Sequence, residues 1–465
     1  VSRVGSFQVE GSATRIAGDG QPVTGSARLI VDRLGSVAVE GVFGSPPQGD
    51  SEFRLAMESD SIAEVAALGS FTLGDVGPFR GEADIRLMPE QVLLEEFHLR
   101  VGDNDLHGSI VYRFAADHGG RAEIDAQLWS SYVNVNELLP PPERRFLFGA
   151  EPLPVRWART HDVNVDFEVG RFLRRDYDLR SLTGKVSSKN GEVDAYSNSS
   201  AFGGDLALHL MLDTRSTPYR AKYQYDWKGL NLALLPAARK VDREITGRVN
   251  LKGRITGAGN SLHQIMKRGD GYLFVDLESA RFLRSGMELL TTSPINIAEQ
   301  ILREVSPWAQ RKKFFEIECG VIGMRIENGI GRSLAPPDHT IAIKAKEFRL
   351  AGFGDVQLAD ESMNLSVRSK ARRLGLSAAT LIEQSGLSPI YSPFYRIAGT
   401  LLRPKVEPDP QGTDLLETGV KLGAAWATGG TSVFLLSLID RLVIEPVGCE
   451  GAKERARALV PSSVL

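Results

Sequence analysis

The sequence predicts a mostly β protein, in which repetitive antiparallel strands form an elongated curved sheet or groove with a few short helices and a C-terminal helical cap. Strict alternation is the first observation, because the stretch from Ile245 to Ile255 places apolar residues or glycine at odd positions and polar residues at even ones. This period gives a strand one apolar and one polar face, as in antiparallel sheets. Turn signals such as Asn190-Gly191 and Asn328-Gly329 are the second observation. They leave room for roughly 20 to 25 strands.

Helical patterns are few. They are expected at residues 61–68, 296–312, 374–384 and 415–442. These segments are too few to cover the apolar face of so many strands. Either two sheets close over one another as sandwiches, or the apolar face curls into a groove that something else covers.

The composition excludes several classes of protein. The chain has 465 residues, of which 42% are hydrophobic, so disorder of the whole chain is excluded. With 55 basic and 58 acidic residues its net charge is −3, which does not favour a nucleic-acid partner. No charged-then-apolar leader follows Val1, so we expect any membrane anchor of the full-length protein to lie outside this sequence.

No motif in the sequence indicates an enzyme, a metal site or a cofactor. The seven histidines have no ligand spacing, and Gly257-Ala258-Gly259 lacks the third glycine of a dinucleotide loop, which favours a simple turn into a helix. Glu95 and Glu96 are adjacent in a predicted strand, so we expect them on opposite faces and not as a convergent catalytic pair. We therefore expect a non-enzymatic protein without catalytic, metal-binding or cofactor-binding residues.

The two cysteines, Cys319 and Cys449, leave two possibilities open. They can form one disulfide in an oxidising compartment, or they can be two unrelated buried thiols.

A weak repeat combines an apolar strand, a short turn, a strand ending in glycine, a longer strand and a closing Asn/Leu segment. Its two copies, at 94–139 and 179–235, lie about 95 residues apart. The repeat, together with the ordered segments 190–204, 251–262, 315–329 and 396–406, resembles the AsmA family, within the wider AsmA, TamB and YhdP group of Gram-negative envelope proteins. The first 80 residues and the segment 287–313 depart from the pattern.

The resemblance implies a periplasmic protein, anchored to the inner membrane of a Gram-negative bacterium, that supports phospholipid transfer from the inner to the outer membrane. The implied partners are a phospholipid or another acyl lipid, a membrane reached through the anchor, and other envelope proteins. A periplasmic address favours oxidation, so we expect a disulfide between Cys319 and Cys449 that fastens the C-terminal helix to the sheet.

The apolar phase of the strands supplies the candidate lipid-lining residues. They are Val163, Val165, Phe167, Val169, Leu206, Leu208, Leu210, Val249 and Leu251. In the alternative interpretation, a structural or assembly scaffold of outer-membrane biogenesis, the same residues form the dry core of closed β-sandwich domains.

Four segments are expected along the chain. They are an N-terminal β segment at 1–80, a repeated β-groove segment at 81–255, an AsmA-like β region at 256–410 with a helical insert at 287–313, and a C-terminal helix and tail at 411–465. Residues 422–439 carry no charge, but two adjacent glycines interrupt them, so we expect a helical cap in preference to a membrane span.

Overall fold

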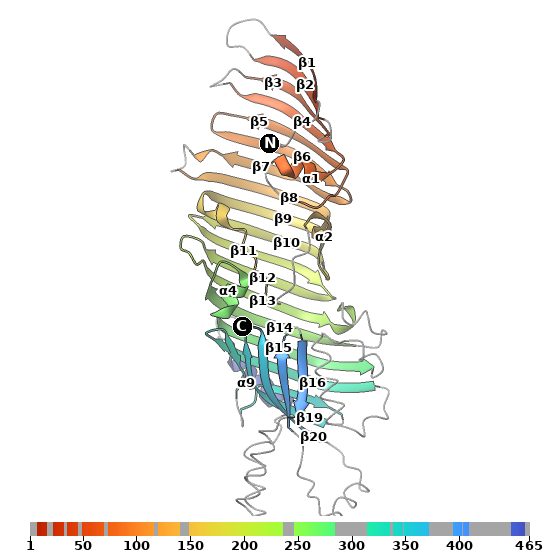
Figure 1. The fold of residues 1–465 in the computed structure, drawn as a ribbon, viewed down its shortest axis with the longest axis vertical. Coiled ribbons are helices and arrows are strands. Elements are labelled where there is room, and N and C mark those ends of the chain that lie inside the picture. The colour runs from red at the N-terminus through yellow and green to blue at the C-terminus, as the bar shows by residue number, and fades with distance from the viewer. Residues whose placement is uncertain are drawn as a thin grey trace, which may run out of the picture. The chain divides into compact units, whose positions relative to one another are not determined.

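The computed structural model, drawn in Figure 1, describes residues 7–15, 22–31, 35–44, 49–68, 73–115, 120–139, 148–235, 246–283, 314–334, 338–346, 348–371, 394–401, 403–408 and 448–460. The fold is mostly β, as the alternation predicts. The strands are β1 Phe7–Arg15, β2 Val23–Val31, β3 Gly35–Phe43, β4 Ser51–Ser59, β5 Phe79–Leu87, β6 Gln91–Val101, β7 Asn104–Arg113, β8 Ala122–Asn134, β9 His161–Arg174, β10 Tyr177–Lys189, β11 Glu192–Ala201, β12 Gly204–Asp213, β13 Arg220–Asn231, β14 Thr246–Ala258, β15 Asp270–Leu283, β16 Phe314–Glu327, β17 Ile330–Arg332, β18 Ile341–Ala345, β19 Phe348–Gln357, β20 Ser362–Ala371, β21 Phe394–Thr400 and β22 Arg403–Pro408.

The helices within these ranges are short. They are α1 Ile62–Leu68, α2 Val135–Leu138, η2 Arg156–Arg159, η3 Leu232–Leu234, α4 Leu262–Lys267 and α9 Cys449–Ala458. Helix α1 confirms the helix expected at 61–68, and α4 confirms that Gly257-Ala258-Gly259 leads into a helix. Ser261 caps α4, because its side chain accepts a hydrogen bond from the N–H of Gln264. The helices expected at 296–312, 374–384 and 415–442, the insert 287–313 and the uncharged stretch 422–439 lie outside the described residues. Within the described ranges, no helix combines the length and apolar character needed to cross a bilayer.

The chain divides into two compact units. The first comprises residues 1–143, 154–201 and 206–219, and the second comprises residues 144–153, 202–205 and 220–465. These two units do not coincide with the four segments expected from the sequence pattern. The four segments remain a prediction.

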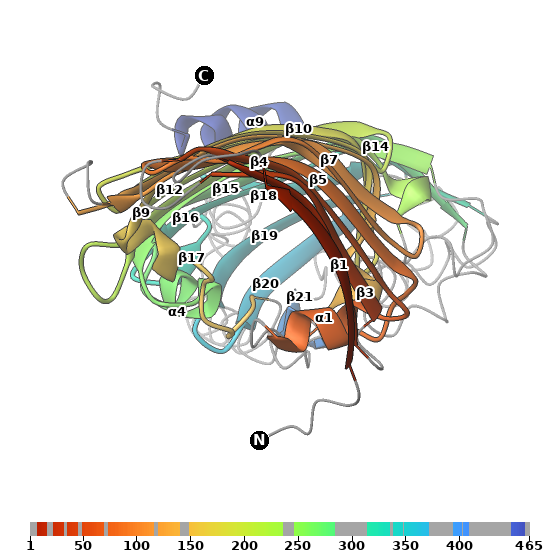
Figure 2. The ribbon, with the colours of Figure 1, turned by 90° about the horizontal axis from the view of Figure 1, so that it is seen from above.

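In the first unit each strand pairs with its neighbour in sequence, from β1 to β11. These pairings form one layer, whose strands are strongly bent in the view of Figure 2. All of these pairings are antiparallel except β8 with β9, which is parallel. A hairpin turn cannot join parallel neighbours. The long connection from Asn134 to His161 therefore returns the chain to the end from which β8 started.

Arg121 fastens the end of this connection to the sheet. Its Nε donates to Asp162 Oδ1 at 2.8 Å, and its two terminal nitrogens donate to the carbonyl oxygens of Arg159 (2.7 Å), Ala158 (2.9 Å) and His161 (3.0 Å). A guanidinium has the donors for such a fork. Ala158 is fully buried under it, so the connection is ordered where it enters β9.

Asp105, at the start of β7, holds the end of β8. Its carboxylate accepts hydrogen bonds from the N–H groups of Ser131 (3.0 Å) and Tyr132 (2.8 Å). Burial raises the pKa of Asp105, but the hydrogen bonds from Ser131 and Tyr132 outweigh this effect and leave the pKa below its ordinary value.

We therefore expect Asp105→Asn to destabilise the first unit by about 1 kcal/mol at neutral pH. Because the folded pKa is depressed, the ionised carboxylate stabilises the fold above the unfolded pKa of about 3.9 and loses this effect as pH falls through the folded value. Urea unfolding of both proteins at several pH values measures this. A difference between them that does not shrink below about pH 3.9 would contradict the ionised Asp105 as its cause.

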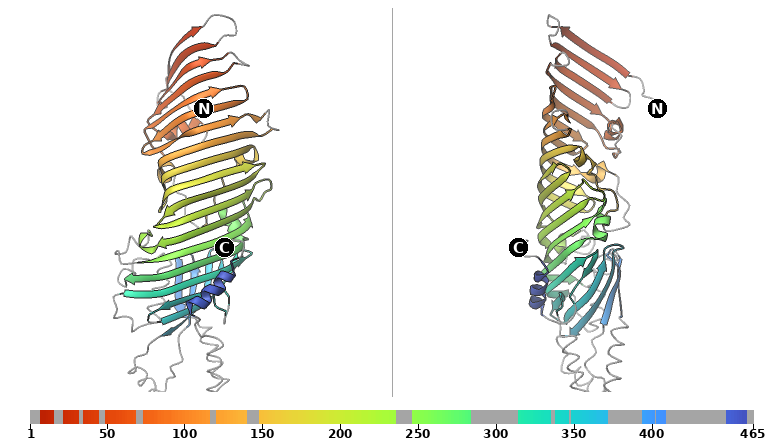
Figure 3. Two further views of the ribbon diagram at one scale, coloured as in Figure 1. Left: turned by 180° about the vertical axis from the view of Figure 1, so that it is seen from behind. Right: turned by 90° about the vertical axis from the view of Figure 1, so that its left-hand side faces the viewer.

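In the second unit, β13 to β16 continue the antiparallel pattern, and β18 to β22 follow in the same way. Strand β17 lies between the ends of β16 and β19. The two further views of Figure 3 show these strands turning in direction beyond β16. Buried apolar residues are numerous here. They include Val321, Met324, Ile341, Leu350, Val356 and Val367.

Candidate functional site

The candidate residues of β9 lie on one face of the first unit's sheet. Directly paired residues of neighbouring strands share a face. Val165 pairs with Val186 of β10 and with Ala126 of β8, while Phe167 pairs with Gly184 and Leu128. Alternation then places Val163 and Val169 beside them, so all four β9 candidates form a continuous apolar surface with their neighbours.

The same face extends over the rest of the unit. We call it the apolar face of the first unit, and its members follow from the printed register of each strand pair. They include Val9, Ala13, Ala27, Leu29, Val37, Val39, Phe53, Leu55, Met57, Ala83, Ile85, Val92, Leu94, Phe97, Leu99, Ile110, Tyr112, Ile124, Leu128, Leu182, Val186, Val193 and Ala195.

The candidates of β12 belong to this face as well. His209 Nε2 lies 2.5 Å from Asp194 Oδ1, so His209 is on the face that carries Asp194. Adjacent residues of a strand point to opposite faces of the sheet. Asp194 therefore points away from the face of Val193, and His209 points away from the face of Leu208 and Leu210. The leucines Leu206, Leu208 and Leu210 therefore share the apolar face. Leu206 is buried, and the other two are half-buried.

The opposite face of the first unit carries cross-strand ion pairs. The nitrogen-to-oxygen distances are 2.6 Å for Arg54 with Glu82, 2.8 Å for Arg86 with Glu52, and 3.1 Å for Lys185 with Asp166. Each of these exposed pairs contributes little to stability, but together they indicate that this face is exposed to solvent. We call it the charged face.

Glu95 and Glu96 both lie on the charged face, so the expectation of opposite faces is wrong. Glu95 Oε1 lies 3.2 Å from Arg86 Nη2, and Glu96 Oε1 lies 3.3 Å from His98 Nε2. The reason is a bulge between Leu94 and Phe97, which inserts a residue and shifts the alternation.

Little of the described structure covers the apolar face of the first unit. Its helices α1, α2 and η2 contact β4 and β9, and they lie near the strand ends (Figures 1 and 2). The described part of this unit has no second sheet facing the first. The candidates Val163, Val165, Phe167 and Val169 are accordingly half-buried, and Val9 at the end of the face is 61% exposed.

The second unit has an apolar face of its own. Leu251 pairs with Trp227 and Val275, and Val249 pairs with Leu230 and Leu277. Met324, Ile322 and Ile341 continue this face in β16 and β18. Val249 is buried and Leu251 is half-buried.

Comparison with known proteins identifies a relative of this chain. Over 465 aligned residues the chain is 22% identical to the AsmA family protein YhjG of Escherichia coli (strain K12), and the match covers 92% of this chain. The chain is therefore similar to a member of the AsmA family over most of its length. It spans 61% of the length of that relative. No family model matches the chain, and no solved structure matches it at a significant level. This similarity points to a protein of the bacterial envelope.

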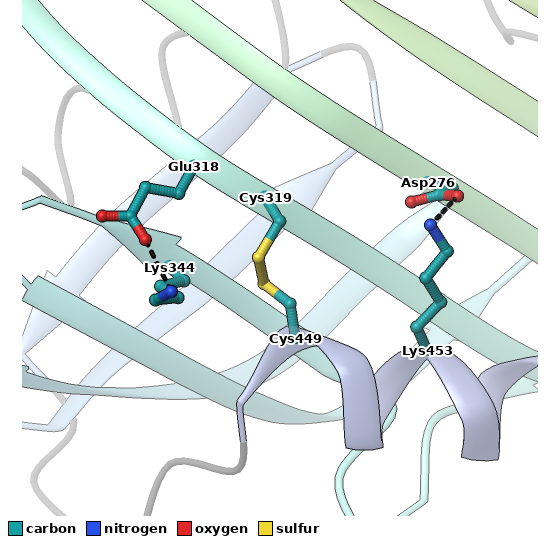
Figure 4. The surroundings of a disulfide bond; sticks show 6 residues. All are labelled: Asp276, Glu318, Cys319, Lys344, Cys449 and Lys453. Carbon is teal, nitrogen blue, oxygen red and sulfur yellow. Dashed lines mark ion pairs between the residues drawn. A yellow bond between two sulfur atoms is a disulfide. The ribbon is translucent and has the colours of Figure 1, made fainter.

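The two cysteines of the chain lie together in the second unit. Cys319 of β16 and Cys449 of α9 form a disulfide across a sequence separation of 130 residues (Figure 4). Next to it, Lys453 Nζ lies 2.5 Å from the buried carboxylate of Asp276. Arg455 adds hydrogen bonds to the carbonyl oxygen of His339.

Helix α9 covers the face of β15 and β16 that is opposite to the apolar face. Its Ala452 and Ala456 pack with Tyr272, Phe274 and Val321 in one buried cluster. Tyr272 and Phe274 pair with Arg254 and Lys252 of β14. These two β14 residues point to the face opposite to that of Leu251, so Tyr272 and Phe274 also lie on that opposite face. The apolar face of the second unit is therefore the face of β15 and β16 that α9 leaves uncovered.

The sequence analysis did not predict that α9 packs against β15 and β16, although the sequence of β15 indicates a strand that is covered on both faces. Residues 272–275 read Tyr-Leu-Phe-Val and are apolar in both phases, which indicates a strand covered on both faces. Gly323 of β16 allows α9 to pack closely, because a Cβ at this position would lie only 2.5 Å from the Cβ of Ala456. Glycine is required for so close an approach.

Charged groups gather at the strand ends of the first unit. Arg80 and Arg100 are direct cross-strand neighbours on the charged face, and with Pro78, Asp103 and Glu137 they line a cavity of about 500 Å³. Arg80 is only loosely paired, with its Nε 3.7 Å from Glu58. The described residues contain no group of three His, Cys, Asp or Glu side chains placed to hold a metal ion.

Proposed function

We propose that the chain binds the acyl chains of a phospholipid, or of another acyl lipid, along its apolar faces and thereby supports lipid transfer from the inner to the outer membrane. The observation that carries this proposal is the two-sided character of the first unit. One face is apolar from β1 to β12 and has little cover among the described residues, while the other carries ion pairs.

The energetics suit reversible binding. Burial of a methylene group contributes about 0.8 kcal/mol, so an acyl chain that covers part of this face is held without any covalent chemistry. Headgroups remain in water at the ends of the strands that bind the acyl chain. The proposed function is therefore non-enzymatic and needs no cofactor.

The proposed setting is the periplasm of a Gram-negative bacterium. There the full-length protein is held at the inner membrane by an anchor outside this sequence, and other envelope proteins are its partners. Similarity to an AsmA-family protein supports this setting, and the disulfide between Cys319 and Cys449 suits an oxidising compartment.

The test is extraction and mass spectrometry of lipid bound to the purified chain. We expect the wild-type chain to carry acyl lipid, and Phe167→Asp or Leu208→Arg to lose most of it, because each variant places a charge where an acyl chain lies. A wild-type chain free of lipid would contradict the proposal.

The chain offers matched controls on the charged face. Tyr196 pairs with Lys185 and is 49% exposed, and Met211 is 41% exposed. Tyr196→Asp and Met211→Arg introduce the same charges on the opposite face and are expected to keep the lipid. If lipid binding is unaffected while Phe167→Asp lowers the unfolding midpoint strongly, the residues are a dry core, as the scaffold alternative requires.

A further inference from the structure

Two arginines of the first unit, Arg80 of β5 and Arg100 of β6, are directly opposed across neighbouring strands, an arrangement of like charges that destabilises a sheet. Arg80 Nε lies 3.7 Å from a carboxylate oxygen of Glu58, and Arg100 Nε donates to the carbonyl oxygen of Gly102 at 3.3 Å. Asp105 faces Arg100 from β7, but its carboxylate is engaged by N–H groups of β8. Within the described part of the chain, no carboxylate forms an ion pair with both guanidinium groups.

A second pair of opposed arginines shows how this chain compensates such charges. Arg171 of β9 and Arg180 of β10 are also direct cross-strand neighbours. The two carboxylate oxygens of Asp178 accept hydrogen bonds from Arg171 at 3.1 and 3.0 Å, and one of them lies 3.9 Å from Arg180 Nη2. An anion that bridges Arg80 and Arg100 would compensate their charges in the same way.

A cavity of about 500 Å³ adjoins Arg80 and Arg100 at the strand ends, and cavities of this size accommodate small ligands. The rest of its lining is Val76, Gly77, Pro78, Gly102, Asp103 and Glu137. Glu137 is held in place, because its two oxygens accept hydrogen bonds from Asn104 Nδ2 at 3.2 Å and from Asn134 Nδ2 at 2.7 Å. The lining thus combines two positive and two negative side chains, which favours a ligand with charges of both signs over a simple anion.

We propose that this cavity binds a phosphate group linked to an ammonium group, as in phosphoethanolamine. Arg80 and Arg100 donate hydrogen bonds to the phosphate oxygens, whose geometry matches a guanidinium, and Asp103 accepts from the ammonium group. Both arginines lie on the charged face. The site is therefore separate from the apolar face, and this inference does not rest on the proposed function.

The test is isothermal titration calorimetry of the full chain with phosphoethanolamine at neutral pH and low ionic strength. We expect saturable binding at one site. Arg80→Gln and Arg100→Gln should each weaken it about tenfold, because each removes a charge-assisted hydrogen bond. Asp103→Asn should weaken the binding of phosphoethanolamine about fivefold and should not weaken the binding of inorganic phosphate, which has no ammonium group.

Arg180→Gln is the matched control, because the side chains of Arg180 and Arg80 are both 70% exposed and Asp178 already compensates Arg180. It should leave the affinity unchanged. Without ligand, Arg80→Gln and Arg100→Gln should keep or raise the unfolding midpoint, since they relieve a like-charge contact. A wild-type chain without saturable binding overturns the proposal. So does a loss of affinity in Arg180→Gln that equals the loss in Arg100→Gln.

The phosphate–ammonium group occurs in soluble phosphomonoesters and, as a phosphodiester, in lipid headgroups. Glycerophosphoethanolamine supplies the diester without acyl chains. Tighter binding of this diester than of phosphoethanolamine assigns a lipid headgroup as the natural source, and tighter binding of the monoester assigns a soluble phosphate compound. Lipid extraction measures the apolar face alone, so a failure of the proposed function and a failure of this site are separate outcomes.

Discussion

Replacing both cysteines, as Cys319→Ser with Cys449→Ser, is expected to lower the free energy of unfolding of the second unit by about 5 kcal/mol, the chain-entropy value for a loop of this size. The disulfide closes a loop with a sequence separation of 130 residues, so its loss frees a long stretch of the unfolded chain. Helix α9 has only ten residues and is not expected to persist once detached. Its departure would expose Tyr272, Phe274 and Val321 to water.

Hydrogen exchange of peptides from β15, β16 and α9, together with the denaturant midpoint, measures this effect. Reductant provides the matched comparison, because it should destabilise the wild-type chain by the same amount and leave the double variant unchanged. Mass spectrometry without reductant should detect the linked peptide that contains Cys319 and Cys449. Equal midpoints for the wild-type chain with and without reductant would contradict a stabilising role of the disulfide.

Arg121→Ala is expected to destabilise the first unit by about 3 kcal/mol. The substitution removes the four hydrogen bonds of the fork and leaves carbonyl oxygens of residues 158, 159 and 161 without their donor. Asp162 would keep its bond from the N–H of Asn190 but lose its ion pair. The connection that makes β8 and β9 parallel should then open locally.

The measurement is urea unfolding combined with hydrogen exchange of residues 156–165. Arg121→Lys keeps the charge but cannot supply donors in a planar fork, so it should recover only a small part of the loss. Arg80→Ala is the control at an exposed arginine and should change stability by less than about 0.5 kcal/mol. Wild-type stability of Arg121→Lys would indicate that charge alone matters at this position.

The sequence predicts the faces of the strands well, because alternation depends only on the strand itself. Val165 and Phe167 share a face because they are two residues apart, whatever their neighbours are. The parallel step from β8 to β9 was not predictable in this way, since Ala126 and Val165 alternate as they would in an antiparallel pair. The bulge beside Glu95 was also missed, because it depends on how β6 meets β7.

Helix α9 illustrates a second limit. Its sequence, Cys449 to Ala458, has Gly451 near the start and only small apolar residues on its buried side, so no strong helical period appears. The helix is fixed by what it contacts, namely Tyr272, Phe274 and the Cys319 disulfide. Local patterns do not reveal such packing contacts between distant segments. The resemblance to the AsmA family led us to expect the Cys319–Cys449 disulfide, but only the stretch of β15 that is apolar on both faces indicated the packing of α9.

The unbroken separation of apolar and charged faces has a consequence for how the lengths of AsmA-family sequences can vary. A single residue inserted within β9 would exchange the faces of all residues beyond it, placing Asp166 among the leucines and valines. A pair of residues would not, and neither would one residue absorbed in a bulge, as at Glu95. Length differences between relatives should therefore gather in turns and bulges, and those within strands should come in even numbers.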